Sequence, residues 1–158
     1  MSPQQILAEL KQTRPFSTLE ETAGVGLART AAILDHAFSE ALRPHGITPT
    51  QYNVLRILRG AGPAGLCRNE VRDRLVARVP DATRLLDRME DLGVVSRDRD
   101  NPDRRYVTAR ITPAGTKLLA ELDGLVLALN RRWFGHLGPA GLTRLIELLD
   151  EIRRAKSE

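Results

Sequence analysis

The feature that most constrains the fold of this chain is a charged hairpin pattern that directly follows two short helical patterns. Residues 97–112 read RDRDNPDRRYVTARIT, in which arginines and aspartates surround the turn signal Asn101-Pro102-Asp103. In chain order, the predicted segments are helices over 68–75 and 80–93, a strand that opens at Val94-Val95 and a second strand over 106–111. The chain must therefore adopt a fold that places a helix pair immediately before a hairpin with adjacent arginines near its tip.

Longer helical patterns flank this segment on both sides. Apolar residues recur at intervals of three to four positions, as they do along one face of an α-helix. The expected helices lie over 3–13, 18–43, 48–60, 113–133 and from Gly138 onward. The helix after Ile47 has a strong start signal, because Thr48 can cap it and Pro49 suits a first helical position. We therefore expect a mainly α fold that carries one small β-hairpin.

Composition supports a helical fold and restricts the class of protein. Hydrophobic residues make up 42% of the 158 residues but aromatic residues only 4%, which favours an aliphatic helical core in one ordinary domain. The chain has no apolar run long enough for a membrane span and no basic leader, so we expect a soluble cytoplasmic protein without a membrane partner. Cys67 is the only cysteine, which excludes an internal disulfide and a cysteine-built zinc site.

The charge balance permits nucleic-acid binding without requiring it. The net charge is +4, and arginine outnumbers lysine 21 to 3. The planar fork of arginine suits phosphates and guanine edges, although genome composition can produce the same bias.

The order of the segments gives the more specific argument. A short helix, a tight turn and a second helix form the helix-turn-helix unit, whose second helix enters the major groove of DNA. A hairpin directly after it is a wing, which reaches along the backbone to the adjacent minor groove. The narrow minor groove concentrates negative potential and accommodates a guanidinium, so arginines near the hairpin tip have a physical reason to be there. A solvated charged turn is the alternative, and the preceding helix pair favours the wing.

From about Gly46 to Gly115 the sequence resembles the MarR family of winged helix-turn-helix transcription regulators. The matching stretches read ITPTQYNVLRIL, TRLLDRMEDLGVV, NPDRRYV and RITPAG. The most specific of these matches is the Asp103-Arg104-Arg105 triplet in the wing.

The resemblance implies how the chain is organised. It predicts a single MarR-type domain over 1–158, with a winged helix-turn-helix lobe over 46–112 and dimerisation helices over 1–45 and 113–158. It also implies a homodimer whose partner is double-stranded DNA with a palindromic operator.

The resemblance also implies which residues lie at the DNA. These candidates are Asp81, Thr83, Arg84, Asp87, Arg88, Arg97, Arg99, Asp103, Arg104 and Arg105. In the family, Arg84 and its neighbours lie on the recognition helix and face bases and phosphates. Arg104 and Arg105 correspond to the wing arginines, and Asp103 is the acid that orients them.

Some of these candidates have alternative interpretations. The chain has Pro80-Asp81 where the family usually opens the recognition helix with small hydroxyl residues, and Pro80 suits a first helical turn. Asp81 either accepts a hydrogen bond from a cytosine amino group or pairs with Arg84 as a structural brace, and we favour the brace. Arg97 and Arg99 either contact phosphate or lie on a solvated strand edge.

Family members commonly release DNA when a small phenolic or acidic ligand binds, so the resemblance implies a small aromatic or acidic effector. His36 and Tyr52 lie on helices that border the family's ligand pocket and are the ligand-binding candidates, although structural roles also explain both. Cys67 precedes the first helix of the pair beside Arg68, which favours a reactive thiolate and makes redox sensing an alternative. We disfavour it because the family's peroxide sensors carry their cysteine in the first long helix.

Other function classes have less support. The histidine spacing fits no compact zinc site, so we expect no metal and no cofactor. The sequence has no Gly-rich phosphate loop, nucleophile elbow or HExxH, which argues against an enzyme. A helical protein-interaction module whose wing binds protein is the remaining alternative to a sequence-specific, ligand-responsive repressor.

Overall fold

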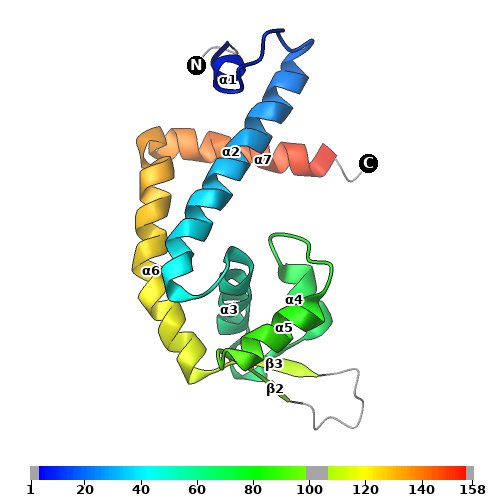
Figure 1. The fold of residues 1–158 in the computed structure, drawn as a ribbon, viewed down its shortest axis with the longest axis vertical. Coiled ribbons are helices and arrows are strands. Elements are labelled where there is room, and N and C mark those ends of the chain that lie inside the picture. The colour runs from blue at the N-terminus through cyan, green and yellow to red at the C-terminus, as the bar shows by residue number, and fades with distance from the viewer. Residues whose placement is uncertain (1–3, 99–106, 156–158) are drawn as a thin grey trace. The chain divides into compact units, whose positions relative to one another are not determined.

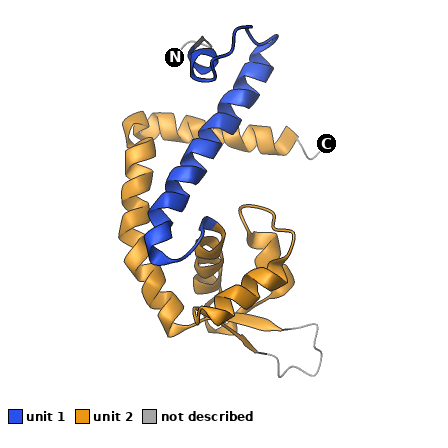
Figure 2. Ribbon diagram, viewed as in Figure 1, with its two compact units in different colours: residues 1–49 blue, residues 50–158 orange. Residues whose placement is uncertain are grey.

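A computed structural model of the chain describes residues 4–98 and 107–155, and Figure 1 shows its helices and strands. The chain divides into two compact units, residues 1–49 and residues 50–158 (Figure 2). The predicted fold class is confirmed, because most described residues are helical and a small antiparallel sheet carries the hairpin. Within the described residues, no helix combines the length and the apolar character that a membrane span requires.

The first unit is helical. Its elements are α1 (Gln4–Glu9), α2 (Leu19–Leu42) and the short 3-10 turn η1 (Arg43–His45). Thr18 caps α2, because its hydroxyl accepts a hydrogen bond from the backbone N–H of Glu21 at 3.1 Å. The helix predicted over 18–43 is therefore confirmed. The helix predicted over 3–13 is too long, since α1 stops before Lys11, which has a positive φ of 51° that no α-helix continues.

The second unit contains the helix pair, the sheet and the two C-terminal helices. Its elements are α3 (Pro49–Ala61), η2 (Gly62–Ala64), β1 (Leu66–Cys67), α4 (Arg68–Arg74), α5 (Ala82–Asp91), β2 (Val95–Asp98), β3 (Thr108–Ile111), α6 (Pro113–Phe134), η3 (Gly135–Leu137) and α7 (Gly138–Arg154). The helices predicted over 48–60, over 113–133 and from Gly138 are confirmed. The first helix of the pair, predicted over 68–75, ends one residue early, at Arg74.

The sheet has three strands rather than the two of the predicted hairpin, with β3 between β1 and β2. Ala109 of β3 pairs with Leu66 of β1 on one side and with Arg97 of β2 on the other. Gly65 permits the approach of β1, because its φ is +69° and a Cβ there would lie 2.5 Å from the carbonyl oxygen of Ala109. Cys67, which precedes the first helix of the pair, belongs to β1, a two-residue strand that is too short to show in the sequence pattern.

The largest fully buried side chains of the second unit are aliphatic apart from one methionine, as the composition predicts. They are Val54, Leu55 and Leu58 on α3, Val71 on α4, Met89 on α5, Val95 on β2, and Leu119 and Leu122 on α6. Helices α3, α4, α5 and α6 thus each turn an apolar face inward, and their polar faces remain available for other contacts.

An ion pair ties α3 to α6. Arg59 donates from Nη1 to Oδ2 of Asp123 at 2.8 Å and from Nη2 to Oδ1 at 3.1 Å. The hydrogen bonds from Arg59 lower the pKa of Asp123, and the same contact raises the pKa of Arg59. The side chains are 38% and 47% exposed, so the pair contributes little stability and mainly fixes where the two helices meet.

Candidate nucleic-acid interface

Helix α5, the second helix of the pair, has one apolar and one polar face. The buried residues are Ala82, Leu86 and Met89, and the exposed ones include Thr83, Arg84 and Arg88. Arg84 and Arg88 are four residues apart, so they lie one above the other on the same face. With its apolar face buried, α5 presents a row of guanidinium donors to solvent. Base edges in the major groove of DNA offer hydrogen-bond acceptors that such donors can bind.

Asp81 caps this helix and holds its first arginine. Its Oδ1 accepts a hydrogen bond from the backbone N–H of Arg84 at 3.0 Å, and its Oδ2 pairs with Nε of Arg84 at 3.3 Å. The structural brace is therefore present. The helix predicted from residue 80 begins instead at Ala82, with Pro80 before the cap, because the Asp81 side chain occupies the capping position. The Arg84 side chain is still 80% exposed.

Arg97 enters from strand β2 and is nearly buried, with 11% of its side chain exposed. It donates from Nε and Nη2 to Oε2 of Glu90 at 2.9 and 2.6 Å, and Nη2 also pairs with Oδ1 of Asp87. Burial alone would lower the pKa of Arg97, but the hydrogen bonds to Glu90 and Asp87 outweigh it and raise the pKa. A solvated strand edge is thus the wrong description of Arg97, because two carboxylates of α5 neutralise it there.

Arg68, at the start of α4, contacts α5 and is not among the candidates that the sequence provides. Its Nη1 lies 3.4 Å from the hydroxyl of Thr83, and its Nη2 lies 3.3 Å from the side-chain oxygen of Asn69. Arg68 and Arg72 are four residues apart on α4 and both are exposed. This spacing is visible in the sequence and predicts that both arginines share one face of α4.

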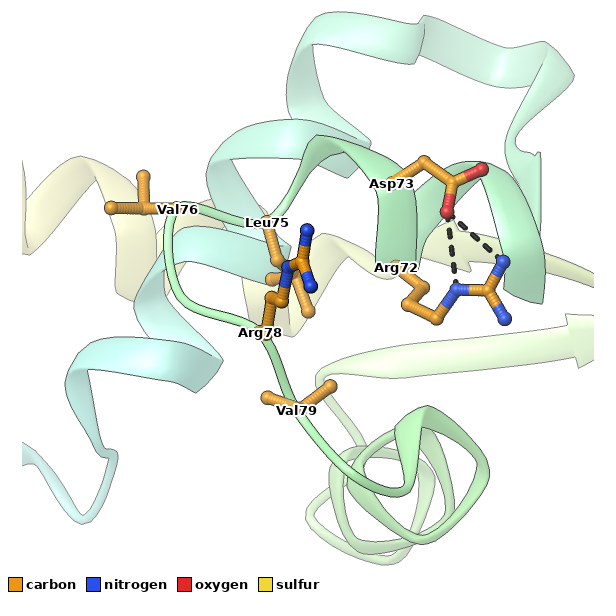
Figure 3. A pocket seen from close by; sticks show the side chains of 6 residues that line it. All are labelled: Arg72, Asp73, Leu75, Val76, Arg78 and Val79. Atoms are coloured by element: carbon orange, nitrogen blue, oxygen red, sulfur yellow. Dashed lines mark hydrogen bonds and ion pairs between the residues drawn. The ribbon is translucent and has the colours of Figure 1, made fainter. Parts of the chain in front are cut away.

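The loop between α4 and α5 borders a hollow of about 520 Å³ (Figure 3). It is lined by Arg72, Asp73, Leu75, Val76, Arg78 and Val79. Arg72 pairs with Asp73 at 3.0 Å, whereas Arg78 is exposed in the loop itself. The side-chain oxygen of Asn53 accepts a hydrogen bond from the backbone N–H of Val76 at 2.9 Å, which anchors the loop to α3.

Cys67 is the N-cap residue that directly precedes α4, and its backbone has a structural contact. Its backbone N–H donates to Oε2 of Glu70 at 2.8 Å, and this hydrogen bond lowers the pKa of Glu70. Arg68, whose charge suggested a reactive thiolate, directs its guanidinium to Thr83 and Asn69. Glu70 therefore caps the start of α4, as Asp81 caps the start of α5.

The base of the predicted wing is present, but its tip is not described. Strands β2 and β3 pair as the hairpin prediction requires. The candidates Arg99, Asp103, Arg104 and Arg105 all lie outside the described residues. On β3, Arg110 donates from Nε to the carbonyl oxygen of Pro63 at 2.9 Å and pairs with Asp98 at 3.3 Å. These contacts fix the wing strands to the 3-10 turn η2.

The two ligand candidates differ in exposure. His36 is exposed on α2. Tyr52 is buried on α3 with 6% exposure, and its hydroxyl accepts a hydrogen bond from Nη1 of Arg56 at 3.2 Å. The guanidinium carbon of Arg56 lies 6.0 Å from the centre of the Tyr52 ring. Within the part of the chain that the structure describes, no three His, Cys, Asp or Glu side chains gather as they would around a metal ion.

Comparisons with known proteins agree with this geometry. The sequence model of the MarR family matches residues 45–105. An uncharacterized HTH-type transcriptional regulator of Bacillus subtilis (strain 168), YkoM, is 29% identical over 118 residues, which are 75% of each chain. The crystal structure of a MarR transcription factor from Planctomyces limnophilus is 37% identical, with a TM-score of 0.68 over 85% of this chain and 98% of that one. The transcriptional repressor CouR, bound to a 23-mer DNA duplex, is 28% identical with a TM-score of 0.75, covering 87% and 96% of the two chains.

Proposed function

This chain belongs to the MarR family and is a transcription regulator rather than an enzyme, and on that premise we propose that it acts as a homodimer on an inverted-repeat operator. The observation that carries the proposal is the orientation of α5. Its apolar face is buried, and Arg84 and Arg88 project from the opposite face beside a hairpin. The DNA duplex bound to the CouR repressor supports the same use of this fold.

The residues of the interface have distinct proposed roles. Arg84 lies nearer the N-terminus of α5 and contacts base edges, while Arg88 lies one turn further along and contacts phosphate. Thr83 and Arg68 supply further phosphate contacts near the start of the same helix. Arg104 and Arg105 remain the proposed minor-groove contacts, and Arg99 a proposed phosphate contact, on the sequence argument alone. Asp81 acts as the cap that holds Arg84.

The proposed dimer uses the terminal helices, over 1–45 and 113–158. These helices leave large apolar side chains exposed, and α7 has no buried residue at all. The exposed residues are Leu19, Leu27 and Ile33 on α2, Leu127 on α6, and Ile146, Leu148 and Ile152 on α7. A two-fold interface is the commonest way for a chain to cover such surface, and it would present one α5 per subunit to each half-site.

We also propose that a small aromatic or acidic effector releases the DNA, which would make the protein a ligand-responsive repressor. This step rests on the family, and His36 and Tyr52 are its candidate contacts. Titrating small aromatic acids into the complex between the protein and its operator tests it. Release of DNA by none of them would contradict the proposed effector class.

Selection of bound sequences from random duplex DNA tests the DNA-binding function directly. We expect an inverted repeat with half-site centres roughly one helical turn, about 10 base pairs, apart. The affinity for the selected duplex should fall steeply as salt rises, because bound phosphates release counterions. No enrichment, or binding without a salt dependence, would favour the protein-interaction module instead.

A further inference from the structure

Arg97 is the point where the wing meets helix α5. Its guanidinium forms hydrogen bonds with Glu90, and its backbone N–H donates to Oε1 of the same carboxylate at 3.2 Å. The same guanidinium pairs with Asp87. Glu90 therefore holds both the main chain and the side chain of one β2 residue, which fixes the strand and the helix together.

The neighbours of Arg97 leave its guanidinium little access to DNA. Ala109 is paired with Arg97 on the neighbouring strand β3 and is fully buried, so the arginine has a small, buried side chain beside it. Asp87 and Glu90 are three residues apart on α5, so they project from one side of the helix towards the same guanidinium. With 11% of its side chain exposed, Arg97 lacks the free surface that a phosphate contact needs.

We propose that Arg97 is a positioning residue, which fixes the rotation of α5 against the wing through Asp87 and Glu90 and thereby determines which base pairs Arg84 reaches. The inference rests on the proposed DNA-binding function and deepens it. Asp87 immediately precedes Arg88 and follows Arg84 by three residues, so a rotation of the helix at Asp87 displaces both arginines. Asp87 is then part of this brace, and base recognition falls to Arg84.

The charges of these groups make the proposal testable, because it predicts whether DNA affinity rises or falls when a carboxylate loses its charge. A carboxylate close to DNA repels phosphate, so removing its charge should raise DNA affinity if Asp87 has no other role. If Asp87 holds Arg97, the same substitution should lower the affinity for the operator, because α5 loses its orientation. A structural role and a direct electrostatic role therefore predict opposite outcomes for Asp87→Asn.

The experiment measures binding of the operator that the wild type selects, and of a random duplex, over a range of salt concentrations. The variants are Asp87→Asn, Glu90→Gln and Arg97→Met, with Asp91→Asn as the matched control, since Asp91 is an exposed carboxylate at the end of the same helix. We expect each brace variant to lose roughly tenfold in operator affinity, with little change on the random duplex. The slope of log K against log salt should stay as in the wild type, because no phosphate contact is removed. Asp91→Asn should bind the operator at least as tightly as the wild type.

Coupling between the variants completes the test. Combining Asp87→Asn with Arg97→Met should cost little more than Arg97→Met alone, because both substitutions break one brace. Thermal unfolding identifies any variant that fails to fold. In that case the operator affinity of Glu90→Gln, which keeps a hydrogen-bond acceptor, is compared with that of the wild type instead. The proposal is overturned if Asp87→Asn raises operator affinity, or if Arg97→Met reduces the salt slope by about 0.9, the value for one lost phosphate contact. If the wild type selects no duplex, the proposed function itself is wrong; normal wild-type selection with unaffected brace variants contradicts only this inference.

Discussion

The junction between α6 and the sheet allows one substitution to be worked out in detail. Gly115 lies in the first turn of α6, where a Cβ would stand 2.2 Å from the carbonyl oxygen of Val94 and 2.9 Å from Cγ1 of Ile111. The nearer atom belongs to the backbone, so it cannot move aside as a flexible side chain would. That same carbonyl accepts a hydrogen bond at 3.2 Å from the backbone N–H of Thr112, the residue that caps α6. Gly115→Ala must therefore displace the start of α6.

The magnitude follows from three contributions. Forcing a methyl group into a packed site costs about 1–3 kcal/mol. Weakening the hydrogen bond between Thr112 and Val94 costs about 1 kcal/mol more. The higher helix propensity of alanine offsets roughly 1 kcal/mol, so we expect Gly115→Ala to lose about 1–3 kcal/mol of unfolding free energy.

Urea denaturation of the wild type and of Gly115→Ala measures this loss. Gly60→Ala is the matched control, because Gly60 is an exposed helical glycine of α3 and a Cβ added there would meet no atom within 4 Å. We expect this control to be neutral or to gain up to about 1 kcal/mol. If Gly115→Ala is as stable as the wild type, the close approach of α6 to Val94 does not exist in solution.

The remaining predictions concern assembly, pH and redox chemistry. Sedimentation at micromolar concentration should show a homodimer, and a stable monomer would contradict the use of the terminal helices as an interface. Because the Arg59 contact lowers the folded-state pKa of Asp123, its stabilising effect is present above the ordinary value of 3.8 and is lost as pH falls through the lower folded value. Asp123→Asn should therefore lower the free energy of unfolding at pH 7 by no more than about 1 kcal/mol, seen as a slightly lower melting temperature. This difference from the wild type should vanish in acid. A difference that does not change with pH would argue against the ion pair. Cys67→Ser should leave DNA binding and its response to peroxide unaltered, whereas a peroxide-driven release that the substitution abolishes would establish redox sensing.

The sequence predicts the elements that have a long repeating pattern. Helix α2 and helix α6 each show apolar residues at helical spacing between recognisable ends, and both are found with nearly the expected bounds. Strand β1 has two residues and no pattern to detect, so it becomes evident only from its pairing with β3. The start of α5 depends on which side chain caps the helix. Asp81 is that cap, because it accepts a hydrogen bond from the backbone N–H of Arg84.

The candidate site is predicted less completely than the fold. The periodicity of α5 identifies Arg84 and Arg88 as exposed neighbours, and the structure places them so. A sequence shows that Arg97 and Asp87 are charged but not that they contact each other, because their pairing depends on how β2 lies against α5. The expectation that Arg97 is either a phosphate contact or a solvated residue omitted this third possibility. Only the tertiary contact distinguishes an exposed arginine from one whose guanidinium is paired with carboxylates of α5.

The most direct test of the account compares Arg84→Ala and Arg88→Ala over a library of all single substitutions in the selected operator. Because Arg84 lies nearer the N-terminus of α5, Arg84→Ala should lose the preference for one or two particular base pairs, at about 1–3 kcal/mol. Arg88→Ala should weaken binding to every sequence by a similar factor and lower the salt slope by roughly 1. If Arg84→Ala keeps the wild-type preference profile while Arg88→Ala loses it, α5 does not lie in the groove as proposed. If neither variant changes binding, α5 is not the element that reads the operator.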